Sequence, residues 1–140
     1  RDVVKQDTNH YESKLTDPDE AAEFVCRSEI DALAVCVGNV HGEYSRPPSL
    51  DFERLREIQQ SVPIPLVLHG VSGLPDNLVA ESIGLGVRKL NVNTEIRQAY
   101  IKALRDKISM GDIELTDIMK AALLSMREVI RAKIRQFAGR

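Results

Sequence analysis

The sequence predicts an α/β protein built around a parallel sheet. Three segments of strand length, two apolar runs at residues 33–37 and 66–68 and a mixed one at 87–92, alternate with segments in which apolar residues recur at helical spacing. Strands that alternate with helices are typical of a parallel α/β architecture. The run at 33–37 is almost wholly apolar, as expected for a strand that is covered on both faces.

The first helix is predicted from a strong set of start signals. Asp17 can cap the helix, Pro18 fits its first position, and Glu20 stands where a capping box requires an acidic residue. We expect this helix to run to about Ser28. Its buried stripe contains Ala21, Phe24 and Val25.

Two further helices connect the strands. Asp51 caps the second helix, which ends before the prolines at positions 63 and 65. Pro75 opens the third helix, and Gly84 and Gly86 close it. The side chains expected to face the core from these two helices are Phe52, Leu55, Ile58, Leu78, Val79 and Ile83.

Two more helices follow the last strand. One spans about residues 95–108, Gly111 breaks the chain, and a long helix then extends from Leu115 to about Phe137. The apolar stripe of the long helix consists of Ile118, Met119, Ala122, Leu123, Met126, Val129, Ile130, Ile134 and Phe137. We interpret its basic residues as a solvated face rather than a binding patch: Lys120, Arg127, Arg131, Lys133 and Arg135.

The organisation is that of one domain. Residues 1–15 are polar, mixed in charge and without periodicity, so we expect a loop that leads into a domain formed by residues 16–140. His10 lies in that loop and is interpreted as a solvated side chain. A chain of 140 residues with 43% hydrophobic content is large enough to bury a core.

Composition argues against two classes of partner. The net charge is −2 and no basic patch dominates, which argues against nucleic acid. No apolar run approaches the length needed to span a membrane. Cys26 and Cys36 lack CxxC spacing, and we expect both to be reduced, buried thiols in a cytoplasmic protein.

Two histidines follow apolar runs, and each precedes a glycine. His41-Gly42 comes after the first run and His69-Gly70 directly after the second. Two neutral imidazoles that converge from neighbouring strands suit a divalent transition metal, zinc above others. The alternative interpretation is a pair of structural histidines that hydrogen-bond within loops.

Small and hydroxyl-bearing residues follow the second and third runs. Gly70–Gly73 and Asn93-Thr94 each lead into a helix, where backbone N–H groups attract anions and small residues permit close approach. The hydroxyl groups of Ser72 and Thr94 add neutral hydrogen bonds. These features predict a phosphate site, and the alternative is ordinary helix capping by Ser72 and Thr94.

With these residues, the sequence resembles the class II, metal-dependent ketose-bisphosphate aldolases. Three segments carry the resemblance: GNVHGEY around His41, VLHGVSG around His69, and VRKLNVNTEIRQAY around residues 91–94. The intervening TDPDEAAEFV and LDFERLREI and the closing MREVIRAKIRQFAG also match. The resemblance extends from about Leu15 to the end of the chain, with the segments in the family's order.

The resemblance implies the carboxyl-terminal part of a (β/α)8 barrel that makes or cleaves a ketose 1,6-bisphosphate, with dihydroxyacetone phosphate and glyceraldehyde 3-phosphate as partners of the reaction. Zinc in such enzymes polarises the ketone, and His41 and His69 would be two of its ligands. A monovalent cation near the phosphate and a homo-oligomer, dimer or tetramer, are also implied. The residues that would bind substrate are Gly42, Gly70, Val71, Ser72, Asn91, Val92, Asn93 and Thr94.

The sequence departs from the family at two points. Val71 stands where the family has glycine or alanine, and a branched side chain disfavours positive φ there. The family's first half, with a third zinc ligand and an aspartate base, has no counterpart, so we expect a carboxyl-terminal half without a catalytic residue of its own. Two alternatives are a metal-free barrel enzyme in which both histidines act as acid and base, and a degenerate barrel that binds sugar phosphate without aldol catalysis.

Overall fold

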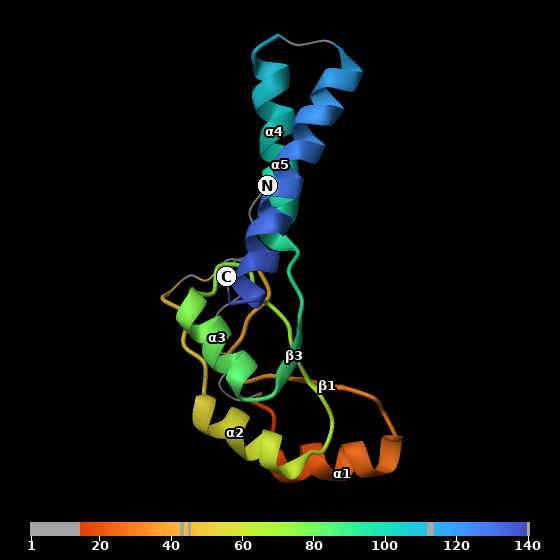
Figure 1. Ribbon diagram of the computed structural model, residues 1–140, viewed down its shortest axis with the longest axis vertical. Coiled ribbons are helices and arrows are strands. Elements are labelled where there is room, and N and C mark those ends of the chain that lie inside the picture. The colour runs from red at the N-terminus through yellow and green to blue at the C-terminus, as the bar shows by residue number, and fades with distance from the viewer. Residues whose placement is uncertain (1–14, 43, 45, 112–113, 140) are drawn as a thin grey trace. The chain divides into compact units, whose positions relative to one another are not determined.

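The computed structural model describes residues 15–42, 44, 46–111 and 114–139, which form two compact units divided after Asn91 (Figure 1). The first unit alternates helices and strands: α1 (Pro18–Ser28), β1 (Leu33–Val35), α2 (Phe52–Ser61), β2 (Leu66–Leu68), α3 (Asp76–Gly84) and β3 (Val87–Leu90). The second unit contains α4 (Thr94–Ser109) and α5 (Leu115–Phe137).

The three strands form one parallel sheet in the order β1-β2-β3. Leu33 lies opposite Leu66 and Val35 opposite Leu68, while Leu66 and Leu68 lie opposite Val87 and Leu90. The predicted α/β class is therefore confirmed. Because all three strands are parallel and adjacent, their carboxyl ends meet at one edge of the sheet.

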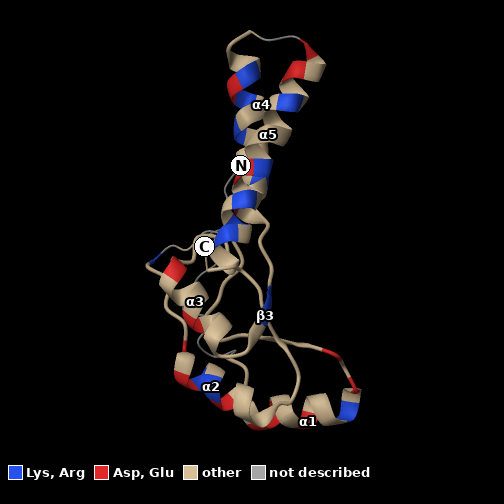
Figure 2. Ribbon diagram, in the orientation of Figure 1, with Lys and Arg blue, Asp and Glu red and all other residues tan. Residues whose placement is uncertain are grey.

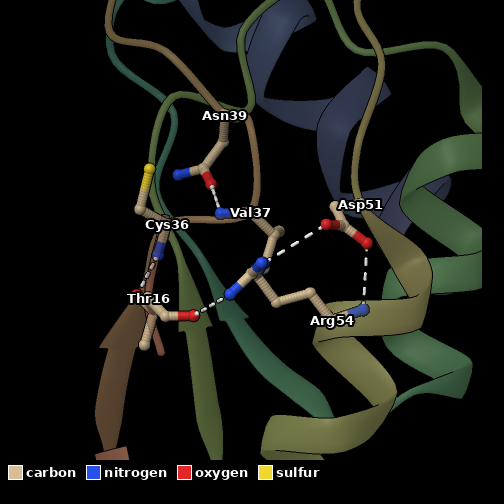
Figure 3. Close-up of polar contacts among 6 residues, drawn as sticks. All are labelled: Thr16, Cys36, Val37, Asn39, Asp51 and Arg54. Atoms are coloured by element: carbon tan, nitrogen blue, oxygen red, sulfur yellow. Dashed lines mark hydrogen bonds and ion pairs between the residues drawn. The ribbon is translucent and has the colours of Figure 1, made fainter. Parts of the chain in front are cut away.

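The first and third strands are shorter than predicted. β1 ends at Val35 rather than at residue 37, because the next backbone groups bond outside the sheet. The N–H of Thr16 donates to the carbonyl of Cys36, and the N–H of Cys36 donates to Thr16 Oγ1. The N–H of Val37 donates to Asn39 Oδ1 at 2.8 Å, and the carbonyl of Val37 accepts from the N–H of Asp51 (Figure 3). β3 ends at Leu90 rather than at residue 92.

The core of the first unit lies under β2, which is buried along its whole length. Fully buried apolar side chains come from the strands, from helices α2 and α3 and from the loops at the strand ends: Leu55, Ile58, Leu66, Leu68, Val37, Val71, Val79 and Val87. Ala34 of β1 is exposed, so the expectation that this strand is covered on both faces is wrong for the described chain.

Helix α1 begins and packs largely as the sequence predicts. Asp17 Oδ1 accepts from the N–H groups of Asp19 and Glu20 at 2.9 and 3.1 Å, which confirms the cap. Ala21 and Val25, one helical turn apart, are buried. Phe24 is 55% exposed, so its predicted burial is wrong, because it lies beside the stripe formed by the other two. The thiol-bearing residues also differ from expectation: Cys26 is exposed and Cys36 only half-buried.

Helix α2 begins with a side-chain cap, whereas α3 begins without one. The carboxylate of Asp51 accepts from the N–H of Arg54 at 2.9 Å, which confirms the predicted cap of α2. Pro75, which was predicted to open the third helix, immediately precedes α3 and makes no side-chain cap bond. Arg54 also donates to the carbonyl of Thr16 at 3.2 Å, which fastens α2 to the segment before α1 (Figure 3).

In the second unit, α4 and α5 pack against each other. Ile118 and Ala122 of the predicted stripe are buried, whereas Met119, Leu123 and Ile134 are 37%, 49% and 62% exposed and were wrongly predicted to face inward. Lys133 is not on the solvated face, because its Nζ pairs with Glu95 at 2.8 Å. Figure 2 shows acidic and basic residues interspersed along both helices. None of the described helices is long and apolar enough to cross a membrane.

Candidate metal and phosphate site

The two strand-end histidines lie side by side. His69 directly follows β2, and His41 lies in the loop after β1; their ring centroids are 5.4 Å apart and their planes are tilted by 59°. Two imidazoles that share a tetrahedral zinc at Zn–N distances of about 2.0–2.1 Å would have centroids roughly 5 Å apart. The spacing and the nitrogen donors therefore fit a zinc ion.

The electrostatics of His69 favour the neutral imidazole that metals bind. Burial is the main cause that lowers its pKa below the usual 6.5, and the neighbouring His41 and Lys89 lower it further. A neutral ring offers a lone pair to a metal over a wider range of pH than an exposed histidine does.

The loops that carry the histidines touch through their backbones. Gly70, with φ of +64°, approaches so closely that a Cβ atom there would lie 2.0 Å from the carbonyl oxygen of Val40. The buried side chain of Asn39 adds a second link, because its Nδ2 donates to the carbonyl of His69 at 3.2 Å while its Oδ1 accepts from Val37.

Tyr44 adds a third link between the same loops. Its hydroxyl donates to the carbonyl of Gly70 at 3.0 Å and accepts from the N–H of Val40 at a longer 3.4 Å. Burial is the largest influence on the Tyr44 pKa and raises it above 10.0, so the hydroxyl keeps its proton at neutral pH. Sequence reasoning missed Tyr44 and Asn39; their only signal is a position within five residues of His41.

Asn91 and Lys89 approach His69 from the neighbouring strand. The Nδ2 atom of Asn91 lies 3.2 Å from Nδ1 and 3.1 Å from Nε2 of His69, and its Oδ1 accepts from Lys89 Nζ at 2.6 Å. The lysine fixes which way the amide faces, with its NH₂ group toward the imidazole. Asn91 thus lies beside His69, and its contact with substrate stays a prediction. Lys89 was missed, although it stands two residues before Asn91.

The predicted phosphate loop after β2 is compact. Val71 and Ser72 are buried, and the N–H of Val71 donates to the carbonyl of Asn91 at 3.4 Å. Val71 has a negative φ, since Glu29 is the only non-glycine residue with positive φ in the described part of the chain. The branched side chain at this departure from the family is therefore compatible with the loop.

The capping alternative does not hold for either hydroxyl residue. The residue that precedes α3 is Pro75 and not Ser72, and the residue that precedes α4 is Asn93, which makes no side-chain cap bond. Thr94 is the first residue of α4. Val92, Asn93 and Thr94 belong to the second unit, and their contact with substrate stays a prediction.

Only two metal-binding side chains converge in the described chain. No group of three or more histidine, cysteine, aspartate or glutamate residues that could hold a metal occurs in the ranges given above. His10, which was interpreted as solvated, lies outside the described residues. Two imidazoles with adjacent backbone N–H groups make up part of a metal site at the strand ends of a parallel α/β fold, which is where βα-barrel enzymes hold their substrates.

The chain belongs to the class II fructose-bisphosphate aldolase family, whose sequence model matches residues 2–140. It is 37% identical to the YdjI aldolase of Escherichia coli K12, with a TM-score of 0.76, over 87% of this chain and 44% of that one. A candidate fructose-1,6-bisphosphate aldolase from Coccidioides immitis is 34% identical, with a TM-score of 0.83, over 89% and 43% of the two chains.

A third structure supports the fold. The fructose-bisphosphate aldolase of Campylobacter jejuni is 22% identical, with a TM-score of 0.74, over 97% of this chain and 49% of that one. The chain thus spans less than half of the length of each of these structures. The three parallel strands and their helices match part of the class II aldolase barrel, which confirms the family and fold predicted from the sequence.

Proposed function

We propose that the complete polypeptide containing this chain is a zinc-dependent aldolase that reversibly cleaves a ketose 1,6-bisphosphate to dihydroxyacetone phosphate and glyceraldehyde 3-phosphate. This chain would form the carboxyl-terminal half of its barrel. The observation that carries the proposal is the pair of imidazoles with centroids 5.4 Å apart at the carboxyl ends of adjacent strands. Family membership supports the same conclusion.

Each residue of the site has a distinct task in this proposal. His41 and His69 would hold the zinc ion, which when bound would polarise the ketone carbonyl of the substrate. Asn91, oriented by Lys89, would present its NH₂ group to the oxygens of the ketose. The third zinc ligand and the proton-transferring base would come from outside this chain.

The phosphate group would bind at the loops after β2 and β3. The N–H groups of Gly70 and Ser72 and the Ser72 hydroxyl would donate hydrogen bonds to it, with Val71 lining the loop between them. The family resemblance implies that Val92, Asn93 and Thr94 also bind substrate. Gly42 would line the same side. Carbonyl oxygens near Gly42 and Gly70 would bind a monovalent cation beside the phosphate.

The complete polypeptide is also proposed to form a homo-oligomer. Large apolar side chains are exposed on both helices of the second unit, among them Ile101, Ile108, Leu115, Leu123 and Leu124. Exposed apolar surface is typical of faces that associate with a partner. Sedimentation analysis of the complete polypeptide would test this, and a monomer at all concentrations would contradict it.

Metal content and activity of the complete polypeptide test the catalytic proposal together. The wild-type protein should hold one zinc ion per site and release dihydroxyacetone phosphate from fructose 1,6-bisphosphate or tagatose 1,6-bisphosphate. His41→Ala and His69→Ala should lose both zinc and activity, whereas His10→Ala, the matched control, should retain both. Full activity in the presence of a strong chelator would favour the metal-free barrel, and sugar-phosphate binding without cleavage would favour the degenerate one.

A further inference from the structure

We propose that Tyr44 is a positioning residue that holds the His41 loop on the His69 loop and thereby sets the affinity of the metal site. The inference rests on the proposed zinc site and extends it to a residue that touches neither metal nor substrate. Tyr44 lies three residues after His41 along the chain, and its hydroxyl reaches the loop of the other histidine.

One hydroxyl group serves both loops. The N–H of Val40, which donates to it, belongs to the residue just before His41, and the carbonyl of Gly70, which accepts from it, belongs to the residue just after His69. A phenol can accept and donate at once, so a single oxygen links the two backbones on which the imidazoles are mounted. Phenylalanine would fill the same space and make neither bond.

The aromatic ring lies beside the second loop. A Cβ atom built on Gly73 would lie 3.8 Å from Cδ2 of Tyr44, so the ring is near the turn that follows Ser72. Removal of the hydroxyl alone would leave the ring in this position. The role of the hydroxyl can therefore be separated from that of the ring.

His41 depends on its loop for its position. Its ring has no hydrogen-bond partner among the described residues, and its one ring contact is with His69. Metal-binding histidines are usually oriented by a partner on the second ring nitrogen, and loss of such outer-shell groups weakens metal binding by about 10–100-fold. At His41 the backbone links take that place, and Tyr44 provides a hydrogen bond to the residue just before it.

The test compares Tyr44→Phe with wild type in the complete polypeptide, and Tyr100→Phe is the matched control. Tyr100 also loses a hydroxyl contact, but with Met119 in the second unit. Zinc affinity is measured by competition with a chromophoric chelator, and the geometry of the site by the visible absorption spectrum of bound Co²⁺. We expect Tyr44→Phe to bind zinc about 10-fold or more weakly and to alter the Co²⁺ spectrum, while Tyr100→Phe matches wild type.

Three results would overturn the proposal, each in a different way. Wild-type affinity and an unchanged Co²⁺ spectrum in Tyr44→Phe would show that the hydroxyl does not position His41. A Val40 amide that exchanges with solvent as fast as an unprotected amide in wild type would show that the link is absent, even if the variant failed to fold. Zinc binding by the His41→Ala variant with the affinity of wild type would refute the proposed zinc site itself.

Discussion

Replacement of Gly70 by alanine tests whether the two histidine loops touch as the structure shows. The new Cβ would lie 2.0 Å from the carbonyl oxygen and 2.6 Å from the carbonyl carbon of Val40, where ordinary contacts begin at 3.4 Å. Neither atom belongs to a flexible side chain, so one backbone has to move away from the other by well over an ångström. Strain of this kind in a packed region costs about 1–3 kcal/mol.

The backbone conformation of Gly70 adds a second cost to that of the steric clash. Gly70 has φ of +64°, and an L-residue held in the left-handed region loses roughly 1–2 kcal/mol relative to glycine. Together the two terms predict that Gly70→Ala lowers the free energy of unfolding by about 2–5 kcal/mol. The separation of the histidine rings should also change, so that zinc affinity falls with stability.

Gly73→Ala is the matched control, because it lies in the same loop with φ of +82° but has room for a methyl group. Among the described residues its Cβ would meet only Tyr44 Cδ2, at an ordinary 3.8 Å. Urea denaturation of the complete polypeptide should therefore show a loss of roughly 1–2 kcal/mol for Gly73→Ala and a clearly larger loss for Gly70→Ala. Equal losses for the two variants would refute the close approach of Gly70 to Val40.

Three other predictions concern the caps, the links between elements and the pH dependence of stability. Asp17→Ala should lower the free energy of unfolding by about 1 kcal/mol, because the cap of α1 is lost. Asp17→Asn should keep most of the wild-type stability, because asparagine also caps helices. Equal losses of stability for the two variants in urea denaturation would contradict this. Arg54→Met should cost about 1 kcal/mol, because the carbonyl of Thr16 loses its donor at 3.2 Å; a wild-type urea midpoint would exclude that link. Burial raises the Tyr44 pKa above 10.0, so the unfolded chain ionises first and stability should fall as pH rises beyond 10.0; Tyr44→Phe should lack this part of the fall in urea titrations between neutral and alkaline pH.

The elements of the fold could be predicted because they follow from local patterns. Strand-length apolar runs and helical spacing are properties of neighbouring residues, and so are the caps of Asp17 and Asp51, whose bonds span three residues at most. The end of β1 could not be predicted in the same way. Cys36 is as apolar as its neighbours, but its backbone bonds to Thr16, twenty residues away, and only the folded chain shows that pairing.

The burial of single side chains was predicted less well than the elements that carry them. Phe24, Leu123 and Ile134 were predicted to face the core and are exposed, because helical spacing defines a face but not how much of that face a neighbour covers. Lys133 was assigned to a solvated face and instead pairs with Glu95 of the other helix. Such contacts depend on which elements meet, and no single helix encodes that.

In the candidate site, too, some residues could be found from local sequence patterns and others only from the folded chain. His41 and His69 could be found from their positions at the ends of apolar runs, since parallel strands bring their carboxyl ends together. The residues that hold them in place could not: Asn39 reaches His69 across thirty residues and Tyr44 reaches Gly70 across twenty-six. In the sequence both are polar residues of a loop, with nothing to distinguish them from solvated ones.

The glycines of the two His-Gly pairs have different structural roles, although the sequence motif is the same. In the sequence, the glycine after each histidine predicts a backbone that a ligand can approach. At Gly42, with φ of +102°, that interpretation fits, because no atom of the described residues lies within 4 Å of where a Cβ would be. At Gly70 the same space is occupied by the carbonyl of Val40, so the missing side chain admits the neighbouring loop instead of a ligand. One glycine leaves room beside the site, and the other brings the two histidines together to form it.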